Sequence, residues 1–363
     1  MTGDALATVN LEAIRANART LSAFAGKPIL APIKANAYGH GAVQVARALE
    51  PLVVGFAVAT AGEALKLRAA DIVKDVVLLT PPPPSSLSAL VHNRVSFVVS
   101  STAELERVAL EARAQRETVR VHLKLNTGLN RLGASESEAA AVLQACERHS
   151  SIELFGAMTH LVDSEDLEPA WAMRQIERFT HFLETHRVEV LYRHAANTGG
   201  VLNRALNAHF DLIRPGIGLY GYAPGAELEG TVSLTPAMTL TAPVLFVKPL
   251  SSGEPVSYNA KWVAPADTRV ATVRLGYADG YPRSLSNRAE ALVNGSRVRQ
   301  VGRVCMDQLV LETGDVEISV GDTVTLFGPY GITAEDVARW AGTNSYEILT
   351  GIGSRVERAY QDD

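Results

Sequence analysis

The sequence predicts an α/β protein that consists of a (β/α)8 TIM-type barrel followed by a mainly antiparallel β domain. Over the first two thirds of the 363 residues, short runs rich in β-branched residues alternate with amphipathic stretches whose apolar residues recur every three or four positions. The alternation repeats about eight times, as the strands and helices of a parallel barrel do. After Glu229 the composition changes to prolines, glycines and short β-rich segments, which favours a second domain.

Eight segments are the expected barrel strands, and most of them end where a polar or glycine-rich stretch begins. They are Pro28–Ile33, Val54–Val58, Val76–Leu79, Ser96–Val99, Val119–Leu125, Leu154–Met158, Leu191–His194 and Asp211–Ile213. Thr102–Gln115 and Ser135–Arg148 are expected helices between them. A doubly wound open sheet would alternate in the same way, so the strand count alone does not separate the two folds.

The C-terminal third is expected to form a separate β domain. Its candidate strands are Met238–Val247, Thr268–Val273, Ala291–Val293, Val298–Val301 and Thr323–Phe327. Its one expected helix is Thr333–Trp340, with Thr333 as the N-cap. We therefore expect domains at residues 1–230 and 231–363, with the boundary in the aperiodic stretch between Pro224 and Pro236. Residues 1–11 could pair with the β domain.

Composition and charge argue against several classes of function. Hydrophobic residues make up 47% of the chain and charged residues 20%, which indicates a globular protein with a sizeable core. A net charge of -5 without a Lys/Arg-rich run argues against binding to nucleic acid or to an anionic membrane. We expect no signal peptide and no membrane span, and the two cysteines, Cys146 and Cys305, fit a reducing cytoplasm. HExxH and paired CxxC motifs are absent, so no metal site is expected.

Two lysines lie on an expected strand or directly after one, near the end where barrel enzymes place their active sites. The segment PILAPIKANAYGHG ends an apolar strand at Lys34, and a partly dry pocket there would make the amine a nucleophile. Most lysines are solvated, but the abrupt change from strand to turn favours a functional one. Lys124 shares a strand face with His122 and Asn126, and an inward lysine needs an anion or a modification that removes its charge. A structural ion pair would explain Lys124 equally well.

The last three expected strands end in polar side chains, namely His160, Asn197, Thr198 and Arg214. A lone histidine is more often a packed rim residue than a catalyst. The loops after strands seven and eight are the usual phosphate site of such barrels, and glycines there let backbone N–H groups approach the ligand. Gly216, Gly218 and Gly221 match GxGxxG, but no helical pattern follows them, so we reject a dinucleotide site.

Two dense segments of the β domain carry further candidates. RLGYADGYPR contains Tyr277 in a turn-rich context, and GRVCMDQ contains Cys305, Met306 and Asp307. The ordinary interpretation would be a packed aromatic for Tyr277 and a small buried hydrophobe for Cys305. The residue types alone leave both interpretations open.

Taken together, seven segments resemble the alanine racemase family in their order and spacing. They are IKANAYGHG, KLNTGLNRLG, MTHL, HAANTGG, IRPGIGLYG, GYADGYPR and GRVCMDQ, and the likeness extends from ATVNL to YEILTGIGSRV. The resemblance implies a barrel that carries pyridoxal 5'-phosphate (PLP), a C-terminal β domain, and a head-to-tail homodimer in which each active site takes residues from the partner's β domain. It implies interconversion of L- and D-alanine, usually to supply D-alanine for peptidoglycan.

The resemblance also implies a role for each matched residue. Lys34 resembles the lysine that holds PLP as a Schiff base, and Tyr277 resembles the opposing base, which reaches the site from the other subunit. Arg214 resembles the arginine that faces the pyridine nitrogen, and His160 the residue between Tyr277 and Arg214. The implied phosphate contacts, with Asn197 beside them at the strand end, are Tyr38, Thr198, Gly216 and Ile217.

Substrate contacts and supporting residues are implied in the same way. Arg131 resembles the contact to the phenolic oxygen of the cofactor and to substrate, supported by Lys124, which many members carbamylate. Met306 resembles a backbone contact to the substrate carboxylate, with Cys305 and Asp307 beside it.

The chain departs from the family pattern at some of these positions. Many members have Asp and Gly where Asn126 and Asn130 stand, so carbamylation of Lys124 stays open. Many have Ser where Thr198 stands, which keeps the hydroxyl. Some place a tyrosine near the phosphate where this chain has Ser354, so one phosphate contact is in question and the substrate entry could be more open.

The implied chemistry makes sense of this set of residues. Racemisation removes a proton from one face of Cα and returns it on the other, so two bases on opposite sides suffice. Lys34 would serve one face and Tyr277 the other. A guanidinium does not give up its proton near neutral pH, so Arg214 would leave the pyridine ring a weaker electron sink and limit transamination.

Three alternatives keep part of this interpretation. A racemase for another amino acid, such as serine or a basic one, would keep the fold, because a hydrophobic pocket discriminates a methyl group by only about 1–3 kcal/mol. A PLP-dependent decarboxylase would use an acid at the pyridine nitrogen, and Arg214 argues against it. A non-catalytic PLP-binding protein would lack the second domain that carries Tyr277.

Overall fold

The structure, a computed structural model, describes residues 4–362, which divide into two compact units. The barrel unit comprises residues 14–37 and 42–234. The β unit comprises the described residues up to 13, residues 38–41, and the described residues from 235 onwards. The short segment Tyr38–Gly41 thus belongs to the β unit, although residues of the barrel unit precede and follow it in the sequence.

The barrel unit is built on a curled sheet of seven strands, which lie side by side in sequence order and are all parallel. These are β2 (Leu30–Pro32), β3 (Gly55–Val58), β4 (Asp75–Leu78), β5 (Ser96–Val99), β6 (Val119–Lys124), β7 (Ile152–Met158) and β8 (Tyr192–His194). Seven of the eight expected strands are therefore confirmed, the first in shortened form. Strands β3 and β5 are buried along their whole length, as parallel strands with both faces covered should be.

The eighth expected strand, Asp211–Ile213, forms only an isolated bridge. Ile213 accepts a hydrogen bond from the Leu30 N–H at 2.9 Å and donates one to the Pro28 carbonyl at 3.0 Å, while the Asp211 N–H donates to the Arg193 carbonyl at 3.0 Å. Hydrogen bonds therefore close the ring between β8 and β2 without a full strand. Pro215 lies two residues further on, and because it has no N–H it cannot continue the ladder.

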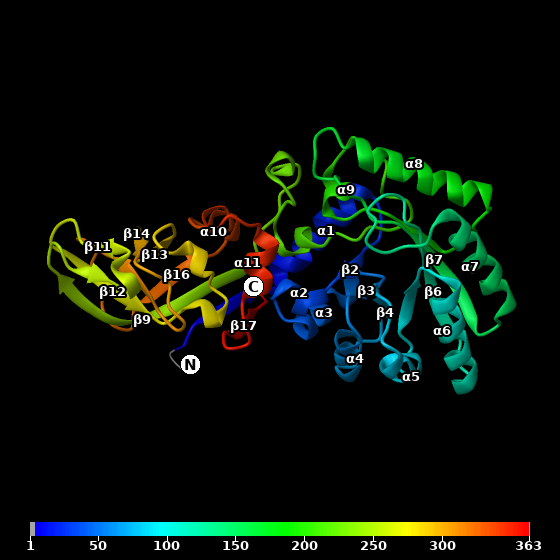
Figure 1. Ribbon diagram of the computed structural model, residues 1–363, viewed down its shortest axis with the longest axis horizontal. Helices are drawn as coiled ribbons and strands as arrows, with labels where there is room; N and C mark the ends of the chain where they lie inside the picture. The colour runs from blue at the N-terminus through cyan, green and yellow to red at the C-terminus, as the bar shows by residue number, and fades with distance from the viewer. Residues whose placement is uncertain (1–3, 363) are drawn as a thin grey trace. The chain divides into compact units, whose positions relative to one another are not determined.

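Helices lie on the outside of this sheet (Figure 1). They are α3 (Ala42–Leu49), α4 (Ala61–Ala69), α5 (Pro84–His92), α6 (Thr102–Gln115), α7 (Glu136–Arg148) and α8 (Ala170–Thr185); α1 (Leu11–Ala25) precedes β2, and the short α9 (Thr198–Leu202) follows β8. The two helices expected from periodicity are α6 and α7, and each starts after a serine cap, Ser101 or Ser135, whose hydroxyl accepts a backbone N–H bond at 3.2 Å. The proline run at residues 81–84 is only in part the expected loop, because Pro84 begins α5, where a missing N–H is tolerated.

The interior of the barrel combines an apolar layer with polar side chains from β6 and β8. The apolar cluster consists of Leu30, Ala57, Val77, Val98, Met158 and Leu212, and neither β6 nor β8 contributes to it. In the sheet register His122 pairs with Val98, and both Lys124 and His194 pair with Met158. Because paired residues of neighbouring strands point to the same face, these polar side chains also face the interior.

The β unit contains an eight-stranded sheet that is antiparallel except for one edge pair. Its strands, in spatial order, are β12 (Thr268–Val273), β15 (Leu309–Glu312), β14 (Ser296–Val301), β13 (Glu290–Val293), β16 (Thr323–Phe327), β9 (Met238–Leu250), β1 (Leu6–Asn10) and β17 (Glu357–Gln361). Pairing of β12 with β9 closes the first six strands into a second, smaller barrel. The early strand β1 pairs with β9 and β17, so the segment considered as a partner of the β domain does join its sheet.

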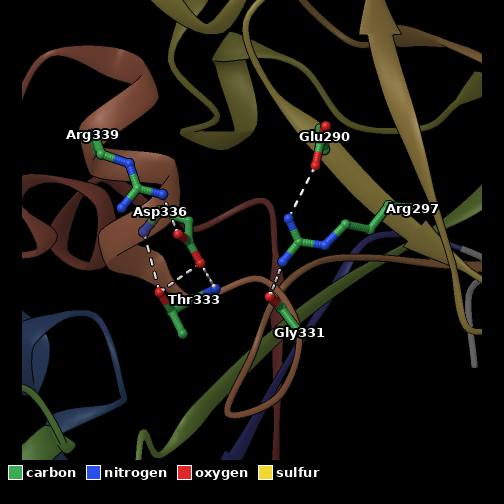
Figure 2. Close-up of polar contacts among 6 residues, drawn as sticks. All are labelled: Glu290, Arg297, Gly331, Thr333, Asp336 and Arg339. Carbon is green, nitrogen blue, oxygen red and sulfur yellow. Dashed lines mark hydrogen bonds and ion pairs between the residues drawn. The ribbon is translucent and has the colours of Figure 1, made fainter.

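The expected C-terminal helix is present as α10 (Ala334–Ala341), and Figure 2 shows how it begins. The Thr333 hydroxyl accepts the Asp336 N–H at 3.1 Å while the Asp336 carboxylate accepts the Thr333 N–H at 2.9 Å, which is a reciprocal capping box. Arg339 forms an ion pair with Asp336 one turn further along. Nearby, Arg297 on β14 bridges the Glu290 carboxylate and the Gly331 carbonyl. Some elements of the β unit were not predicted. They are the helix α11 (Ser345–Gly351), the strands β15 and β17, and the small hairpin of β10 (Pro255–Val256) and β11 (Trp262–Val263).

Candidate active site

Lys34 lies two residues after the end of β2 and starts a left-handed turn, α2 (Lys34–Tyr38). The four residues after Lys34 have φ between 51° and 55°, a conformation that costs roughly 1–2 kcal/mol for each residue with a side chain. Two side-chain contacts stabilise the turn: Glu63 accepts the Ala35 N–H at 2.7 Å, and Asn36 accepts the Ala42 N–H at 3.0 Å. The sequence predicted a turn here but not its handedness. Strain of this kind is concentrated at functional sites.

Lys34 and three other cationic side chains of the barrel unit interact with one another. Burial lowers the pKa of Lys34, Arg131 and Arg214 lower it further, and only Glu63 acts in the opposite sense. Burial also lowers the pKa of Lys124 to about 8, with additional contributions from Arg214, Arg131 and Lys34. A site with this excess of positive charge is suited to an anionic ligand, and its lysines are suited to act as neutral amines.

Arg214 is the most deeply buried member of this group, with 4% of its surface exposed. Its Nη2 donates to the carbonyls of Thr159 and Ala195 at 2.9 and 3.0 Å, and its Nη1 lies 2.7 Å from Nδ1 of His194. Burial lowers its pKa to about 10, so it stays charged at neutral pH. The Nε–H and the second Nη1–H have no acceptor among residues 4–362, which leaves two donors for a ligand.

His160 lies beside Arg214, with its Nδ1 3.4 Å from the Arg214 Nη2. Burial holds its pKa well below the ordinary value, and Arg214, Lys124 and Arg131 add to the effect. The imidazole is therefore neutral at pH 7. The structure thus brings together Lys34, Lys124, Arg131, His160 and Arg214, as the sequence analysis expected.

Thr198 and the segment after Arg214 meet at the same end of the barrel. The Gly218 N–H donates to the Thr198 hydroxyl at 3.2 Å, and a Cβ on Gly218 would lie 2.9 Å from Cγ2 of Thr198, so only glycine permits this approach. Gly216 precedes the 3-10 turn Ile217–Tyr220, which is not the α-helix that a dinucleotide site would need. This local structure agrees with the rejection of a dinucleotide-binding site at the GxGxxG match.

Asn197 caps α9 in this structure. Its Oδ1 accepts the Gly200 N–H at 2.9 Å and the Ser164 hydroxyl at 2.7 Å. Both contacts shape the loop that presents Thr198. The residue predicted as a cofactor contact therefore supports its neighbour, and its carbonyl oxygen is already engaged.

Arg131 is exposed and extends from a loop that Asn126 organises. The Asn126 side chain donates to Oδ1 of Asn130 at 2.9 Å and accepts the Asn130 N–H at 3.0 Å. Asn130 has a φ of 56°, which explains why glycine is suited to this position and why asparagine is tolerated. The two departures from the family pattern thus compensate each other within the loop.

In the β unit, the two segments singled out in the sequence lie against each other. The Tyr277 N–H donates to the Cys305 carbonyl and the Ala278 N–H to the Met306 carbonyl, both at 3.0 Å. The Tyr277 side chain is 42% exposed and Met306 is 53% exposed, so both remain available to a ligand or a partner chain. Cys305 Sγ lies 3.3 Å from the Ser257 hydroxyl.

An arginine that the sequence analysis overlooked joins the same two segments. Arg355 Nη2 donates to Asp307 at 2.8 Å, and its Nε lies 3.1 Å from the carboxylate of Asp279. Asp279 is buried and also accepts the Gly276 N–H at 2.9 Å, which closes the turn that carries Tyr277. Asp307 therefore has a structural role as a partner of Arg355.

Tyr38 is also part of the β unit and is buried. Burial raises the pKa of its phenol to about 12, so it can act only as a neutral hydroxyl donor or acceptor. Its ring centroid lies 6.1 Å from that of Tyr346. Arg358 reaches from β17 to the Gly39 carbonyl at 3.2 Å and also donates to the carbonyls of Ile352, Gly353 and Val356, which ties the Tyr38–Gly41 segment to the C-terminal strand.

Sequence reasoning also missed His194 as a partner of Arg214 and Glu63 as a partner of the Lys34 turn. His194 could have been found, because it ends a strand and points to the same face as Lys124. Glu63 could not, because nothing in the sequence places the first turn of α4 beside Lys34. Among the residues described, no three His, Cys, Asp or Glu side chains are grouped to hold a metal ion. No helix in the described part of the chain is long and apolar enough to cross a membrane.

Comparison with known proteins gives one consistent result. The family models for the alanine racemase N-terminal and C-terminal domains match residues 9–224 and 237–360. A protein named alanine racemase from Deinococcus deserti is 42% identical over 99% of each chain, and one from Deinococcus radiodurans is 42% identical over 98% of each. The crystal structure of alanine racemase from Streptomyces lavendulae superposes with a TM-score of 0.95 at 35% identity, covering 100% of this chain and 98% of the other.

Proposed function

The chain belongs to the alanine racemase family, and from this we propose how its residues divide the work of the reaction. It is a PLP-dependent isomerase that interconverts L-alanine and D-alanine. The single observation that supports the division of roles is the buried Arg214, a permanent cation with two N–H groups left for a ligand.

The residues present fit the cofactor. Lys34 has the lowered pKa that an amine needs to bind the aldehyde carbon covalently, and the cationic cluster around it matches an anionic ligand. Thr198, Gly216, Ile217 and Tyr38 would hold the phosphate, and Arg131 would contact the phenolic oxygen. When bound, PLP supplies the electron sink that makes the Cα proton of the amino acid removable.

Two bases would carry the proton. Lys34 accepts or returns the Cα proton on one face and Tyr277 on the other, while His160, neutral at pH 7, lies beside Arg214 to relay the Tyr277 proton. Arg214 keeps its own protons and offers only donors to the pyridine nitrogen, which disfavours protonation of the ring. Met306 would bind the substrate carboxylate through its backbone.

We propose further that the active protein is a homodimer with shared sites. Tyr277 and Met306 stand half-exposed on the β unit, as residues do that complete a site in a second copy of the chain. Cys146 and Cys305 are both free thiols, which suits the cytoplasm, where D-alanine for the cell wall would be made. In this proposal, the domain at 1–230 binds the cofactor, and the domain at 231–363 contributes residues to the active site of the partner subunit.

A racemisation assay with added PLP tests this proposal. L-alanine, serine, lysine and arginine are supplied separately, and the D-product is measured by chiral separation. We expect turnover of alanine and little else. Turnover of serine or a basic amino acid instead would keep the mechanism and change the substrate, and PLP binding without any turnover would favour a non-catalytic PLP-binding protein.

Two variants test the assignment of the bases. Lys34→Ala should abolish the visible absorbance of the lysine-bound cofactor, whereas Lys66→Ala, an exposed lysine of α4, should not. Tyr277→Phe should slow the uptake of solvent deuterium at Cα from one enantiomer more than from the other, and the exposed Tyr330→Phe serves as its control. Equal loss from both enantiomers would contradict the two-base assignment.

A further inference from the structure

A line of three buried side chains runs through the interior of the barrel from Arg214. Nη1 of Arg214 lies 2.7 Å from Nδ1 of His194, and Nε2 of His194 lies 3.0 Å from Nδ1 of His122. The three residues are 4%, 0% and 1% exposed, so solvent does not reach the contacts. Neither histidine has a place in the reaction as derived above.

The positions of the protons along this line follow from the chemistry of its first member. A guanidinium has donors only, so His194 Nδ1 must accept and its proton must be on Nε2. The Nε2–H of His194 can then only donate to His122, so His122 accepts at Nδ1 and carries its own proton on Nε2. Both imidazoles are neutral, since burial together with the charge of Arg214 lowers the pKa of each.

At His122, the last of the three residues, this arrangement leaves one buried N–H group without an acceptor in the described part of the chain and so lowers the stability of the fold. The Nε2 of His122 has no hydrogen-bond partner among the residues described, although it is fully enclosed. The Phe155 ring lies edge-on to His122, with 5.9 Å between the centroids, and offers no strong acceptor. An unsatisfied buried N–H is destabilising, so some other contact of the ring must offset it.

The space for His122 is provided by a glycine on the neighbouring strand. Gly156 pairs with His122 across β6 and β7, and a Cβ at this position would lie 2.2 Å from His122 Nδ1. The ring is thus held with its Nδ1 toward His194.

We propose that His122 is a positioning residue for Arg214. By accepting the His194 proton at Nδ1, it fixes the His194 ring with its lone pair toward the guanidinium, and so holds the two remaining Arg214 donors in one direction. The tautomers of the two histidines are an inference about the protein itself. The effect on PLP rests on the proposed function, in which Arg214 faces the pyridine nitrogen.

Nitrogen-15 NMR of protein labelled in its histidine rings tests the tautomers without any activity measurement. The exposed His92→Asn variant serves to assign signals and to show the effect of losing an unrelated histidine. We expect both His122 and His194 to carry their proton on Nε2, in the protein without PLP as well as with it. A proton on Nδ1 of His194 overturns the proposal, whether or not the protein is a racemase.

Two substitutions then test the positioning role. His122→Leu removes the acceptor and should leave His194 in a mixture of tautomers, while His122→Asn keeps an acceptor oxygen near the place of Nδ1 and should restore the Nε2–H form. In the loaded enzyme His122→Leu should lower kcat by on the order of tenfold, the effect of losing about one intramolecular hydrogen bond, with little change in KM. If the leucine variant keeps both the His194 tautomer and kcat, or if asparagine restores neither, the positioning role is wrong.

Discussion

Gly276 lies so close to the backbone of Met306 that no side chain fits between them. A Cβ built on Gly276 would lie 2.2 Å from the Met306 carbonyl oxygen and 2.4 Å from that of Cys305. The next two residues donate their N–H groups to those same carbonyls. The segment that carries the proposed base and the segment that carries the proposed carboxylate contact are therefore one rigid piece of backbone.

Gly276→Ala should separate these two segments. Because the obstructing atoms are backbone, the clash cannot be relieved by a side-chain rotation, and we expect a loss of stability of about 1–3 kcal/mol. The racemase activity should fall much more than the protein's capacity to bind PLP, since the barrel unit is untouched. Gly62→Ala is the matched control, because a Cβ there meets nothing within 4 Å. Equal activity of the two variants would show that the close packing of Gly276 against Met306 is not needed for the reaction.

Arg355 should matter for activity in a way that other surface arginines do not. Arg355→Gln removes the cation between Asp279 and Asp307, which should loosen both segments and raise KM for alanine several-fold. Arg339→Gln breaks a comparable Arg–Asp pair on α10 (Figure 2) and should leave the kinetics unchanged. Steady-state kinetics in both directions compare the two variants. A KM for Arg355→Gln within the range of the control would show that Asp279 holds its turn alone.

Gly39 offers a test of the segment that carries Tyr38. A Cβ on Gly39 would lie 2.1 Å from the Leu349 carbonyl oxygen, and the residue has a φ of +84°. Gly253 has nearly the same φ, +86°, but nothing within 4 Å of its Cβ position. Gly253→Ala therefore measures the conformational cost alone, and Gly39→Ala adds the clash. We expect only the second to weaken PLP binding by displacing Tyr38, which a fluorescence titration with PLP would measure.

The architecture could be predicted because it depends on periodicity, which one sequence displays. Seven barrel strands and α10 with its Thr333 cap followed from apolar patterns and a capping residue. The eighth expected strand, Asp211–Ile213, was wrong in its extent, because it forms only a bridge at Ile213. A pattern of three residues cannot show how far the pairing extends. The closing pair β9–β12 of the second barrel was not predicted, because the apolar pattern of a strand does not show which other strand it pairs with.

The candidate site was predictable only where a residue type and its strand position coincide. Lys124 ends β6, Lys34 lies two residues after β2 and Arg214 follows the Ile213 bridge, and all three were found. The handedness of the turn after Lys34 was not, because two alanines, an asparagine and a tyrosine carry no preference for positive φ strong enough to predict it. Arg355 was missed because its partners, Asp279 and Asp307, lie 76 and 48 positions away in the sequence.

Lys124 should make the stability of the protein without PLP depend on pH. Its pKa falls from 10.5 to about 8 on folding, so between these values the unfolded chain binds the proton and the folded chain does not. The free energy of unfolding should therefore rise as pH increases from 8 to 10.5. Below pH 8 both states are protonated and the full penalty applies, on the order of 3 kcal/mol.

Lys124→Met removes this penalty and keeps the volume of the side chain. The variant should be more stable than the native protein at pH 7, and the difference should disappear by pH 10.5, whereas Lys66→Met, at an exposed site, should show no such trend. Chemical denaturation at fixed protein concentration measures this difference in stability.

Bicarbonate tests whether Lys124 can be carbamylated. The neutral amine of Lys124 can add CO2 and release a proton, and the carbamate anion formed would pair with Arg131 and Arg214. Bicarbonate should then stabilise the native protein near pH 8 and leave Lys124→Met unchanged; stabilisation of both would point to a general salt effect and against carbamylation of Lys124.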